Sequence, residues 1–546
     1  MAEGSPRRGP LVIAAIAGVA LILVVRSLTG SGSNDAASPG TSPGKNTDGC
    51  TTIHITASSE KAALMQQIAQ EWNGTTVDGA CFTAAVVSKA SGGAADALAR
   101  GWDETVDGPR PDVWSPAASS WTQLLRQKTT TKDKPDLIGD AALPSLANSP
   151  LVIAMPKPMA VALGWPSKPL GWGDVYRLAQ DPRGWASVGQ KFGAFTLGKT
   201  NPNFSTSGLS ATIGTYVAAT GSSSDLTLDE LKDPKVQAYA RAVENAVVHY
   251  GDTTLTFLSN LQKADDRGQG LSYISAVAVE EKSVWDYNQG NPTGDPKTLG
   301  KHAKPKIPLV AIYPKEGTLL SDSPYAVLQG DWVTDQVRTG AAAFLKVLQN
   351  GATQKQLAAA AFRSSDNTPG PLITEANGLL PQQPTTVLRP PAPKVLAQVE
   401  ALWNAQRKGA RVLLVIDTSG SMGDDAGNGD TKLETAKKAA LRALGEFGPN
   451  DDVALWSFST PLGGAAEPYR ELVAFTPIAK ARPLLQKQIA GLSPRGGTAL
   501  YATARAAFST MANNVSPSTI SAVVLLTDGQ NEYPADNDLA SLLRQL

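Results

Sequence analysis

Histidine and cysteine are scarce in this chain of 546 residues, and net charge is absent. The three histidines, His54, His249 and His302, are widely separated and have no carboxylate or cysteine at ligand spacing, so zinc chemistry and histidine-based catalysis lack support. Lysine plus arginine equals aspartate plus glutamate at 49 each, which gives no electrostatic reason to expect a nucleic acid partner. Charged residues make up only 18 %, below the roughly 25 % of an average soluble domain, as in many exported proteins.

An apolar strand followed by alternating oxygen side chains stands out from the rest of the sequence. Val412 to Ile416 are all apolar, which predicts a strand covered on both faces, as in a doubly wound α/β sheet. Directly after it come Asp417, Ser419 and Ser421, at the strand end where open α/β sheets place ligand sites. Mg²⁺ and Mn²⁺ prefer oxygen ligands such as carboxylates and hydroxyls, so this loop is a candidate cation site.

Two later segments carry matching oxygen side chains. Thr498 follows two glycines at the start of a helical stretch, and Asp528 ends a second apolar strand, VVLLTD. Each segment alone is compatible with an ordinary polar turn or an N-capping hydroxyl. Together, and in this order, the three segments resemble the metal-ion-dependent adhesion site of von Willebrand factor A domains, whose pattern is D-x-S-x-S, a distant Thr and a distant Asp.

The resemblance implies a doubly wound, Rossmann-like A domain over residues 408–546. The implied ligands of Mg²⁺ or Mn²⁺, with Ca²⁺ as an alternative, are Asp417, Ser419, Ser421, Thr498 and Asp528. An acidic group of a protein partner would complete the coordination. Asp424 and Asp425 lie where integrin-type A domains carry a second cation, although acids in such a Gly-rich loop are more often solvated. Domains of this kind usually add a further strand and a closing helix, so we expect residues 408–546 to be C-terminally incomplete.

The first residues predict an attachment to the membrane. A pair of arginines precedes an uncharged, largely apolar run from Gly9 to Val25, near the short limit for spanning a bilayer. Since no small-x-small cleavage site follows the run, we expect an uncleaved, single-pass transmembrane helix at residues 9–26. Residues 1–8 would then be cytoplasmic and the bulk of the chain extracytoplasmic. A Ser, Gly and Pro tract predicts a flexible linker at residues 27–49.

Strand and helix patterns alternate over residues 50–365. The only two cysteines, Cys50 and Cys81, each adjoin a predicted strand, and an oxidising exterior favours a disulfide between them over two buried thiols. Phrases such as PDVWSPAASSW, SPLVIAMPKPMAVALGW and KIPLVAIYPKEGTLLSDSPYAVL resemble bacterial extracellular solute-binding proteins, particularly the branch for molybdate- or sulfate-like oxyanions. The resemblance implies two α/β lobes, with a small polar or oxyanion solute in the cleft between them.

Hydroxyls at predicted helix starts are the candidate solute contacts. Helix amino termini favour anions, because their free N–H groups and the helix dipole both point there. Simple N-capping would explain any one of these hydroxyls equally well. The candidates are Ser58, Ser59, Ser119, Ser120, Ser205, Thr206 and Ser207.

Between the two modules, residues 366–407 begin with a proline-rich stretch and end in a helical pattern, which predicts a linker and a helix. The sequence as a whole therefore indicates a membrane-anchored protein of the bacterial cell envelope that acts by binding and has no enzymatic activity. Alternatively, it is the solute receptor of a transport system, and its A domain only docks the permease. A metal-dependent hydrolase is a third class, but no nucleophile or general base accompanies the cation residues.

Overall fold

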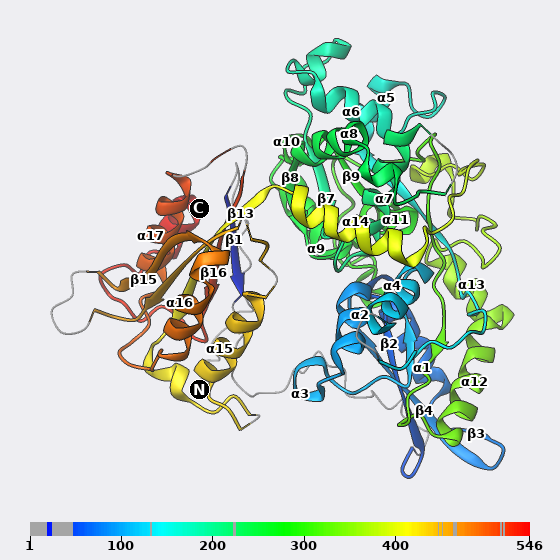
Figure 1. Ribbon diagram of the computed structural model, residues 1–546, viewed down its shortest axis with the longest axis horizontal. Helices are drawn as coiled ribbons and strands as arrows, with labels where there is room; N and C mark the ends of the chain where they lie inside the picture. Colours follow the sequence, from blue (N-terminus) through cyan, green and yellow to red (C-terminus); the bar gives the residue numbers. More distant parts are fainter. Residues whose placement is uncertain are drawn as a thin grey trace, which may run out of the picture. The chain divides into compact units, whose positions relative to one another are not determined.

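The computed structural model of the protein describes residues 19–24 and 47–545, apart from 131–133, 222–224, 428, 446, 450, 462–466, 514–515 and 517–518. The chain forms two compact units, which are shown in Figure 1. One unit comprises residues 34–406, and the other comprises residues 1–33 and 407–546.

The first lobe of residues 34–406 is built on a five-stranded sheet in the order β12-β5-β2-β4-β3. Its centre is β2 (Thr51–Ala57), which pairs in parallel with β4 (Ala80–Ser88) and β5 (Val113–Ser115). The antiparallel edge strands are β3 (Thr75–Val77) and β12 (Ala326–Val327). The helices are α1 (Ser59–Trp72), α2 (Ser91–Arg100), α3 (Glu104–Asp107), α4 (Ser119–Thr130), α12 (Asp335–Gln349) and α13 (Gly351–Ala359).

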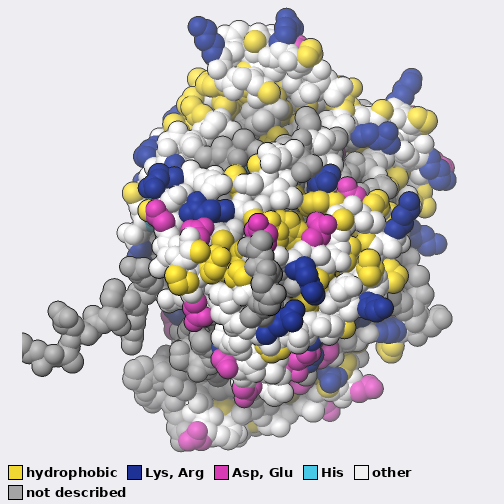
Figure 2. Space-filling view, turned by 90° about the vertical axis from the view of Figure 1, so that its left-hand side faces the viewer, with side chains coloured by type: hydrophobic (Ala, Val, Ile, Leu, Met, Phe, Trp, Pro, Cys, Tyr) yellow, Lys and Arg dark blue, Asp and Glu magenta, His cyan; other side chains and the backbone are white. Residues whose placement is uncertain are grey.

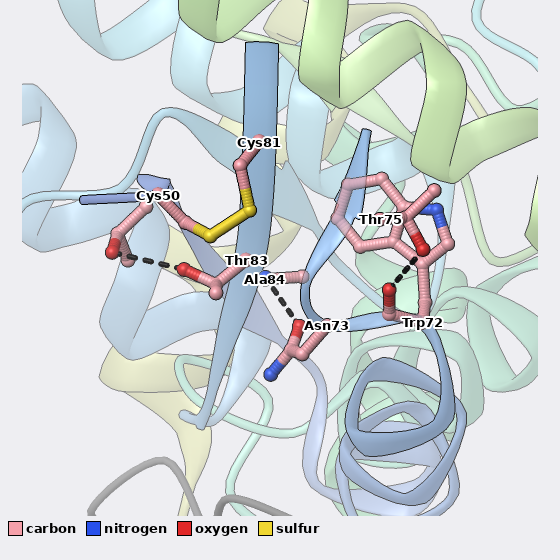
Figure 3. Close-up of a disulfide and its surroundings, with 8 residues drawn as sticks. Cys50, Trp72, Asn73, Thr75, Cys81, Thr83 and Ala84 are labelled. Carbon is pink, nitrogen blue, oxygen red and sulfur yellow. Dashed lines mark hydrogen bonds between the residues drawn. A yellow bond between two sulfur atoms is a disulfide. The ribbon is translucent and has the colours of Figure 1, made fainter. Parts of the chain in front are cut away.

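A disulfide joins Cys50 to Cys81 at the starts of β2 and β4 (Figure 3). The two cysteines directly precede the paired residues Thr51 and Phe82, with their Cα atoms 4.6 Å apart. Next to the bridge, the backbone N–H of Ala84 donates a 2.8 Å hydrogen bond to the side chain of Asn73, which ties the end of α1 to β4. The cysteine pair expected from the sequence thus links two adjacent parallel strands.

The second lobe contains the sheet β10-β6-β9-β7-β8, with β11 also paired to β6. Its first strand, β6 (Ser149–Pro156), is buried along its whole length, as the apolar run in the sequence requires. The other strands are β7 (Leu197–Thr200), β8 (Val247–Gly251), β9 (Ala276–Glu280), β10 (Leu309–Ile312) and β11 (Leu320–Ser321). The helices are α5 (Lys157–Leu163), α6 (Trp172–Gln180), α7 (Thr206–Thr220), α8 (Pro234–Asn245), α9 (Thr254–Asp266), α10 (Gly270–Tyr273) and α11 (Glu281–Asn288).

The predicted linker at residues 366–407 consists of turns followed by helix α14 (Pro393–Gln406). The helix starts one residue before its predicted start and buries Val395, Leu396, Val399 and Trp403. Because these residues recur at helical spacing, one face of α14 is apolar, and it packs against the rest of the unit of residues 34–406. The second unit starts directly after it, with Arg407.

The other unit, which contains residues 407–546, has a sheet in the order β1-β16-β13-β14-β15. Its central strand β13 (Gly409–Asp417) pairs in parallel with β14 (Asp452–Phe458) and β16 (Thr519–Leu526), and β15 (Tyr469–Pro477) closes one edge in antiparallel. The helices are α15 (Lys432–Ala443), α16 (Ile478–Ala490), α17 (Leu500–Ala512) and α18 (Leu539–Gln545). This arrangement is the doubly wound α/β fold expected from the sequence.

Both faces of β13 are covered by helices, which explains its unbroken apolar run. Val412, Leu414 and Ile416 pack in one apolar cluster with residues of α15 and α16. Leu413 and Val415 pack in another, with residues of α17 and α18. On the molecular face shown in Figure 2, basic and acidic side chains both occur, with hydrophobic side chains between them.

In the part of the chain that the structure describes, no helix has the length and apolar character needed to cross a membrane. Of the predicted span at residues 9–26, Val19–Val24 form strand β1, which pairs in parallel with β16. The rest of that span, residues 1–8 and most of the predicted linker at 27–49 lie outside the described residues. The membrane anchor therefore stays a prediction.

Candidate metal centre and solute cleft

The candidate metal loop begins where β13 ends. Asp417 is fully buried at the last position of the strand, and a short 3₁₀ turn, Gly420–Gly423, follows it. One oxygen of the Asp417 carboxylate accepts a 2.7 Å hydrogen bond from the backbone N–H of Ser419, and the other accepts one from the hydroxyl of Thr527. The strand and the turn together fix the direction of this carboxylate.

Hydrogen bonds link the candidate ligands of separate segments. The hydroxyls of Ser419 and Ser421 lie 3.2 Å apart, and the Ser421 hydroxyl donates to a carboxylate oxygen of Asp528 at 2.9 Å. Thr498 is buried, and its hydroxyl lies 3.0 Å from the position that a Cβ atom on Gly529 would occupy, so it is close to the residue after Asp528. The structure thus gathers all five predicted residues at one end of the sheet.

Backbone hydrogen bonds brace the loops that carry these side chains. The N–H of Gly420 donates to the carbonyl of Gly496 at 2.8 Å, and the N–H of Arg495 donates to the carbonyl of Thr418 at 2.6 Å. These two bonds join the D-x-S-x-S loop directly to the loop that presents Thr498. The spacing between the segments is therefore set by the backbone rather than by the side chains alone.

Burial and neighbouring charges set the protonation of the site. Burial raises the pKa of Asp417 to about 6, although hydrogen bonds from Thr527 and Ser419 act in the opposite direction. The ammonium group of Lys432 lies 2.8 Å from Asp528 and 3.3 Å from Asp424. Burial alone would lower the pKa of Lys432, but these two carboxylates outweigh it and raise that pKa. Lys432 is hence a positive charge inside the candidate metal centre.

Sequence reasoning missed Lys432, although a signal was available. The residue is the first of helix α15, directly after the N-cap Thr431. A cation is unfavourable at this end of a helix, where the dipole favours negative charge. A lysine there therefore indicates a local acidic partner, which the structure identifies as Asp528 together with Asp424.

The donor set fits a hard divalent cation. Two carboxylates and three hydroxyls are the oxygen ligands that Mg²⁺ and Mn²⁺ take, with water completing the shell. Among the described residues no group of three His, Cys, Asp or Glu side chains is placed to hold a metal, so a cation here would depend on the hydroxyls. Of the predicted second pair, Asp424 contacts Lys432, and Asp425 accepts a 2.8 Å hydrogen bond from the N–H of Gly427.

The predicted solute contacts lie at helix starts between the two lobes, and most have partners within the protein. The Ser58 hydroxyl accepts a 3.1 Å hydrogen bond from the buried ammonium of Lys61. At the start of α4, the N–H of Ser119 donates to the carboxylate of Asp322 at 2.7 Å, so the protein supplies its own anion there. Ser59 and Ser120 lie in the first turns of α1 and α4, Ser59 half-buried and Ser120 buried.

The hydroxyls around α7 form a closed network. The Thr200 hydroxyl lies 2.8 Å from the hydroxyl of Ser205 and 2.9 Å from that of Ser207. Ser207 also lies 2.8 Å from the hydroxyl of Thr254. Thr206 accepts a 2.8 Å hydrogen bond from the indole N–H of Trp121 in the other lobe. These side chains are therefore already engaged, and one of them bridges the lobes.

A cavity of about 10 Å³ remains between the lobes, which is room for about one water molecule. Of the predicted contacts only Ser58 lines it; the other lining residues are Glu60, Ala117, Ser149, Glu280, Lys282, Ser321, Ser323 and Phe362. Lys282 forms a buried ion pair with Asp286. Burial and, to a lesser degree, the charge of Glu60 raise the pKa of Glu280 to about 8, although hydrogen bonds from Thr254 and Ser321 act in the opposite direction.

A nucleotide-binding pattern also occurs in the sequence, and the structure rules it out. Residues 193–200 read GAFTLGKT, which matches G-x-x-x-x-G-K-[ST]. In a phosphate loop the lysine opens a helix and faces the phosphates. Here Lys199 lies in strand β7 and is buried in an ion pair with Glu244 at 2.6 Å. The match is accidental.

Comparisons with known proteins cover both units. A family model described as "Bacterial extracellular solute-binding protein" matches residues 53–363, and one described as "von Willebrand factor type A domain" matches residues 412–530. A search of curated proteins finds no match.

Similar solved structures are periplasmic binding proteins. A periplasmic thiamin binding protein is 12 % identical, with a TM-score of 0.44 over 66 % of this chain and 98 % of that chain. The sulfate-binding protein SubI from Mycobacterium tuberculosis is 14 % identical, with a TM-score of 0.38 over 58 % and 88 %. The periplasmic binding protein AfuA from Actinobacillus pleuropneumoniae is 13 % identical, with a TM-score of 0.41 over 65 % and 98 %.

Proposed function

Since this chain belongs to the bacterial extracellular solute-binding protein family and carries a von Willebrand factor type A domain, we propose that it is an extracytoplasmic binding protein with two recognition modules. The A domain binds a protein partner through a divalent cation, Mg²⁺ or Mn²⁺. The partner supplies an acidic group that completes the coordination. The predicted anchor at residues 9–26 attaches the protein to the cell membrane, in which case Val19–Val24 leave their pairing with β16, and neither module performs catalysis.

The convergence of three distant segments carries this proposal. Asp417, Ser419 and Ser421 come from one loop, Thr498 from a second and Asp528 from a third, and all lie at the carboxyl end of the same parallel strands. Ser419, Ser421 and Thr498 would contact the cation directly, while the two carboxylates balance its charge. A bound cation supplies an electrophilic centre to which an acidic side chain of the partner can bind.

Calorimetric titration of Mg²⁺ and Mn²⁺ into the full chain tests the metal site. We expect one cation site in the wild type and none in Asp417→Ala. Asp417 both fixes the loop through its hydrogen bonds and supplies negative charge to the cation. Glu434→Ala is the control, since that carboxylate pairs with Lys437 on helix α15 and belongs to neither predicted cation site. A folded Asp417→Ala variant that bound the cation as tightly as the wild type would disprove the proposed site.

A solute receptor function is the second candidate, supported by the family match over residues 53–363 and by the cavity between the lobes. The A domain would then dock the permease of a transport system. Because the hydroxyls of residues 205–207 are engaged within the protein, a polar or oxyanion solute would have to replace those bonds. Thermal unfolding with molybdate, sulfate or phosphate tests this function, and an unchanged transition with every oxyanion would exclude that class of solute.

A further inference from the structure

Helix α14 contacts both lobes of the solute-binding unit. It packs on α4 of the first lobe and on α7 of the second (Figure 1). Leu396 and Val399 of α14 are fully buried in an apolar cluster that also contains residues of both those helices. The cluster members on the two lobes are Trp121, Leu124 and Leu125 of α4, and Ile213, Tyr216 and Val217 of α7.

Polar contacts fix α14 to each lobe separately. On the first lobe, the carboxylate of Glu400 lies 3.5 Å from the ammonium of Lys128. On the second lobe, the indole N–H of Trp403 donates to Glu244 at 2.7 Å, and the same carboxylate holds Lys199 in a buried ion pair. Glu400 and Trp403 are three residues apart and so lie on one face of the helix. That face therefore spans the two lobes.

The two lobes also contact each other directly. The N–H of Gly92 in the first lobe donates to the carbonyl of Phe204 in the second at 3.0 Å. A Cβ atom on Gly92 would lie 1.9 Å from the carbonyl oxygen of Asn203, so the approach depends on glycine. The cavity lined by Ser58, Glu280 and Lys282 is about 10 Å³, so it would have to widen, by separation of the lobes, to hold a solute larger than water.

We propose that α14 is a latch that holds the two lobes closed, so that the solute cleft opens only when α14 releases one of them. Separation of α4 from α7 pulls apart the two surfaces on which α14 lies. It must expose Leu396 and Val399 or break the contact of Trp403 with Glu244. This inference rests on the proposed solute-binding function and assigns the control of that site to the segment that leads into β13 of the A domain.

Hydrogen exchange of the full chain, read by mass spectrometry of peptides, tests the latch without any solute. The Gly92 amide is the reporter, because its acceptor belongs to the other lobe. In the double variant Leu396→Ala with Trp403→Ala, the amides of α14 should exchange at least about tenfold faster than in the wild type. The Gly92 amide should speed up by the same factor. Gln398→Ala, at an exposed position of the same helix, should match the wild type at both.

A milder variant keeps the test decisive if the double variant loses its fold. Trp403→Phe keeps an aromatic ring in place but removes the N–H donor to Glu244, and it should give an intermediate rate in α14 and at Gly92. Faster exchange in α14 with an unchanged rate at Gly92, in either variant, overturns the latch. Because this readout needs neither solute nor cation, its failure is distinct from a failure of the proposed binding functions.

Discussion

At the scale of single residues, the charge of Lys432 is the feature that most affects the candidate metal centre. Its ammonium group contacts Asp528, one of the five predicted ligands, and also Asp424. A cation bound at Asp417 and Asp528 would be repelled by this charge. At an effective dielectric constant of about 20, two unit charges about 6 Å apart repel by about 3 kcal/mol.

Lys432→Met should therefore strengthen cation binding. The methionine keeps most of the buried volume and removes the charge, so we expect the dissociation constant for Mg²⁺ to fall by about tenfold, which corresponds to about 1.4 kcal/mol. Calorimetric titration of the full chain measures it. Lys437→Met is the control, since Lys437 pairs with Glu434 within the same helix. Equal affinity in Lys432→Met and wild type would contradict the expected repulsion.

Glu280 offers a second test at this scale, in the cleft rather than the metal centre. Its pKa is raised to about 8 by burial and, to a lesser degree, by the charge of Glu60. The native state therefore holds a proton that the unfolded chain releases near pH 4.5, and this contribution to stability is lost as pH rises through about 8. The shift corresponds to at most about 5 kcal/mol.

Glu280→Gln should remove this pH dependence. Relative to the wild type, we expect the variant to be more stable by a few kcal/mol at pH 9, and the difference to shrink toward pH 5. Chemical unfolding at several pH values measures both. Glu375→Gln, at an exposed glutamate, should follow the wild type throughout. A gain in stability that is the same at pH 5 and pH 9 would show that Glu280 is not the titrating group.

Residue types and order predicted that the five candidate ligands lie together, because each follows a strand or precedes a helix with a clear local pattern; that they bind a cation stays a prediction. Asp417 is the last residue of β13, Asp528 follows the end of β16, and the pairing of these two strands brings both carboxylates to one end of the sheet. The cleft was not predictable in the same way. Glu280 and Lys282 look like surface charge in the sequence, and only tertiary packing buries them.

At the scale of elements, the close approach of α2 to the loop before α7 is the contact most easily tested. Gly92→Ala places a methyl group against the carbonyl of Asn203 and should keep the lobes apart at this point. Gly93→Ala is a matched control, because its added methyl group would lie 3.7 Å from the ring of Phe204, an ordinary contact. We expect Gly92→Ala alone to increase the radius of gyration in solution scattering. An unchanged radius would mean that the closed contact tolerates the methyl group.

Elements with a strong periodic pattern were the ones that the sequence predicted well. The unbroken apolar run of β13 and the helical spacing in α14 both correspond to the structure, because each reflects burial of a defined face. The elements that such a face packs against cannot be predicted in the same way. Nothing local in α14 shows that Leu396 shares an apolar cluster with residues of both α4 and α7, since both helices lie far earlier in the chain.

At the scale of the whole molecule, the division after Gln406 predicts two separate unfolding events. We expect calorimetry of the full chain to show two transitions and Mg²⁺ to raise only one of them. At a concentration of 100 times the dissociation constant the gain is about 2.7 kcal/mol, or about 5–10 °C for a unit of this size. Asp417→Ala should abolish this rise. A cation that raised both transitions equally would show that the units unfold together.

The disulfide changes how the protein bears mechanical tension if the chain is held at its amino-terminal end. Tension entering there reaches Cys50 first, and the covalent bond passes it to Cys81 in the neighbouring strand. The tension therefore bypasses residues 51–80, and strand β2 is not peeled away from β4 one hydrogen bond at a time. The oxidised protein should thus resist forces that would unzip its reduced form.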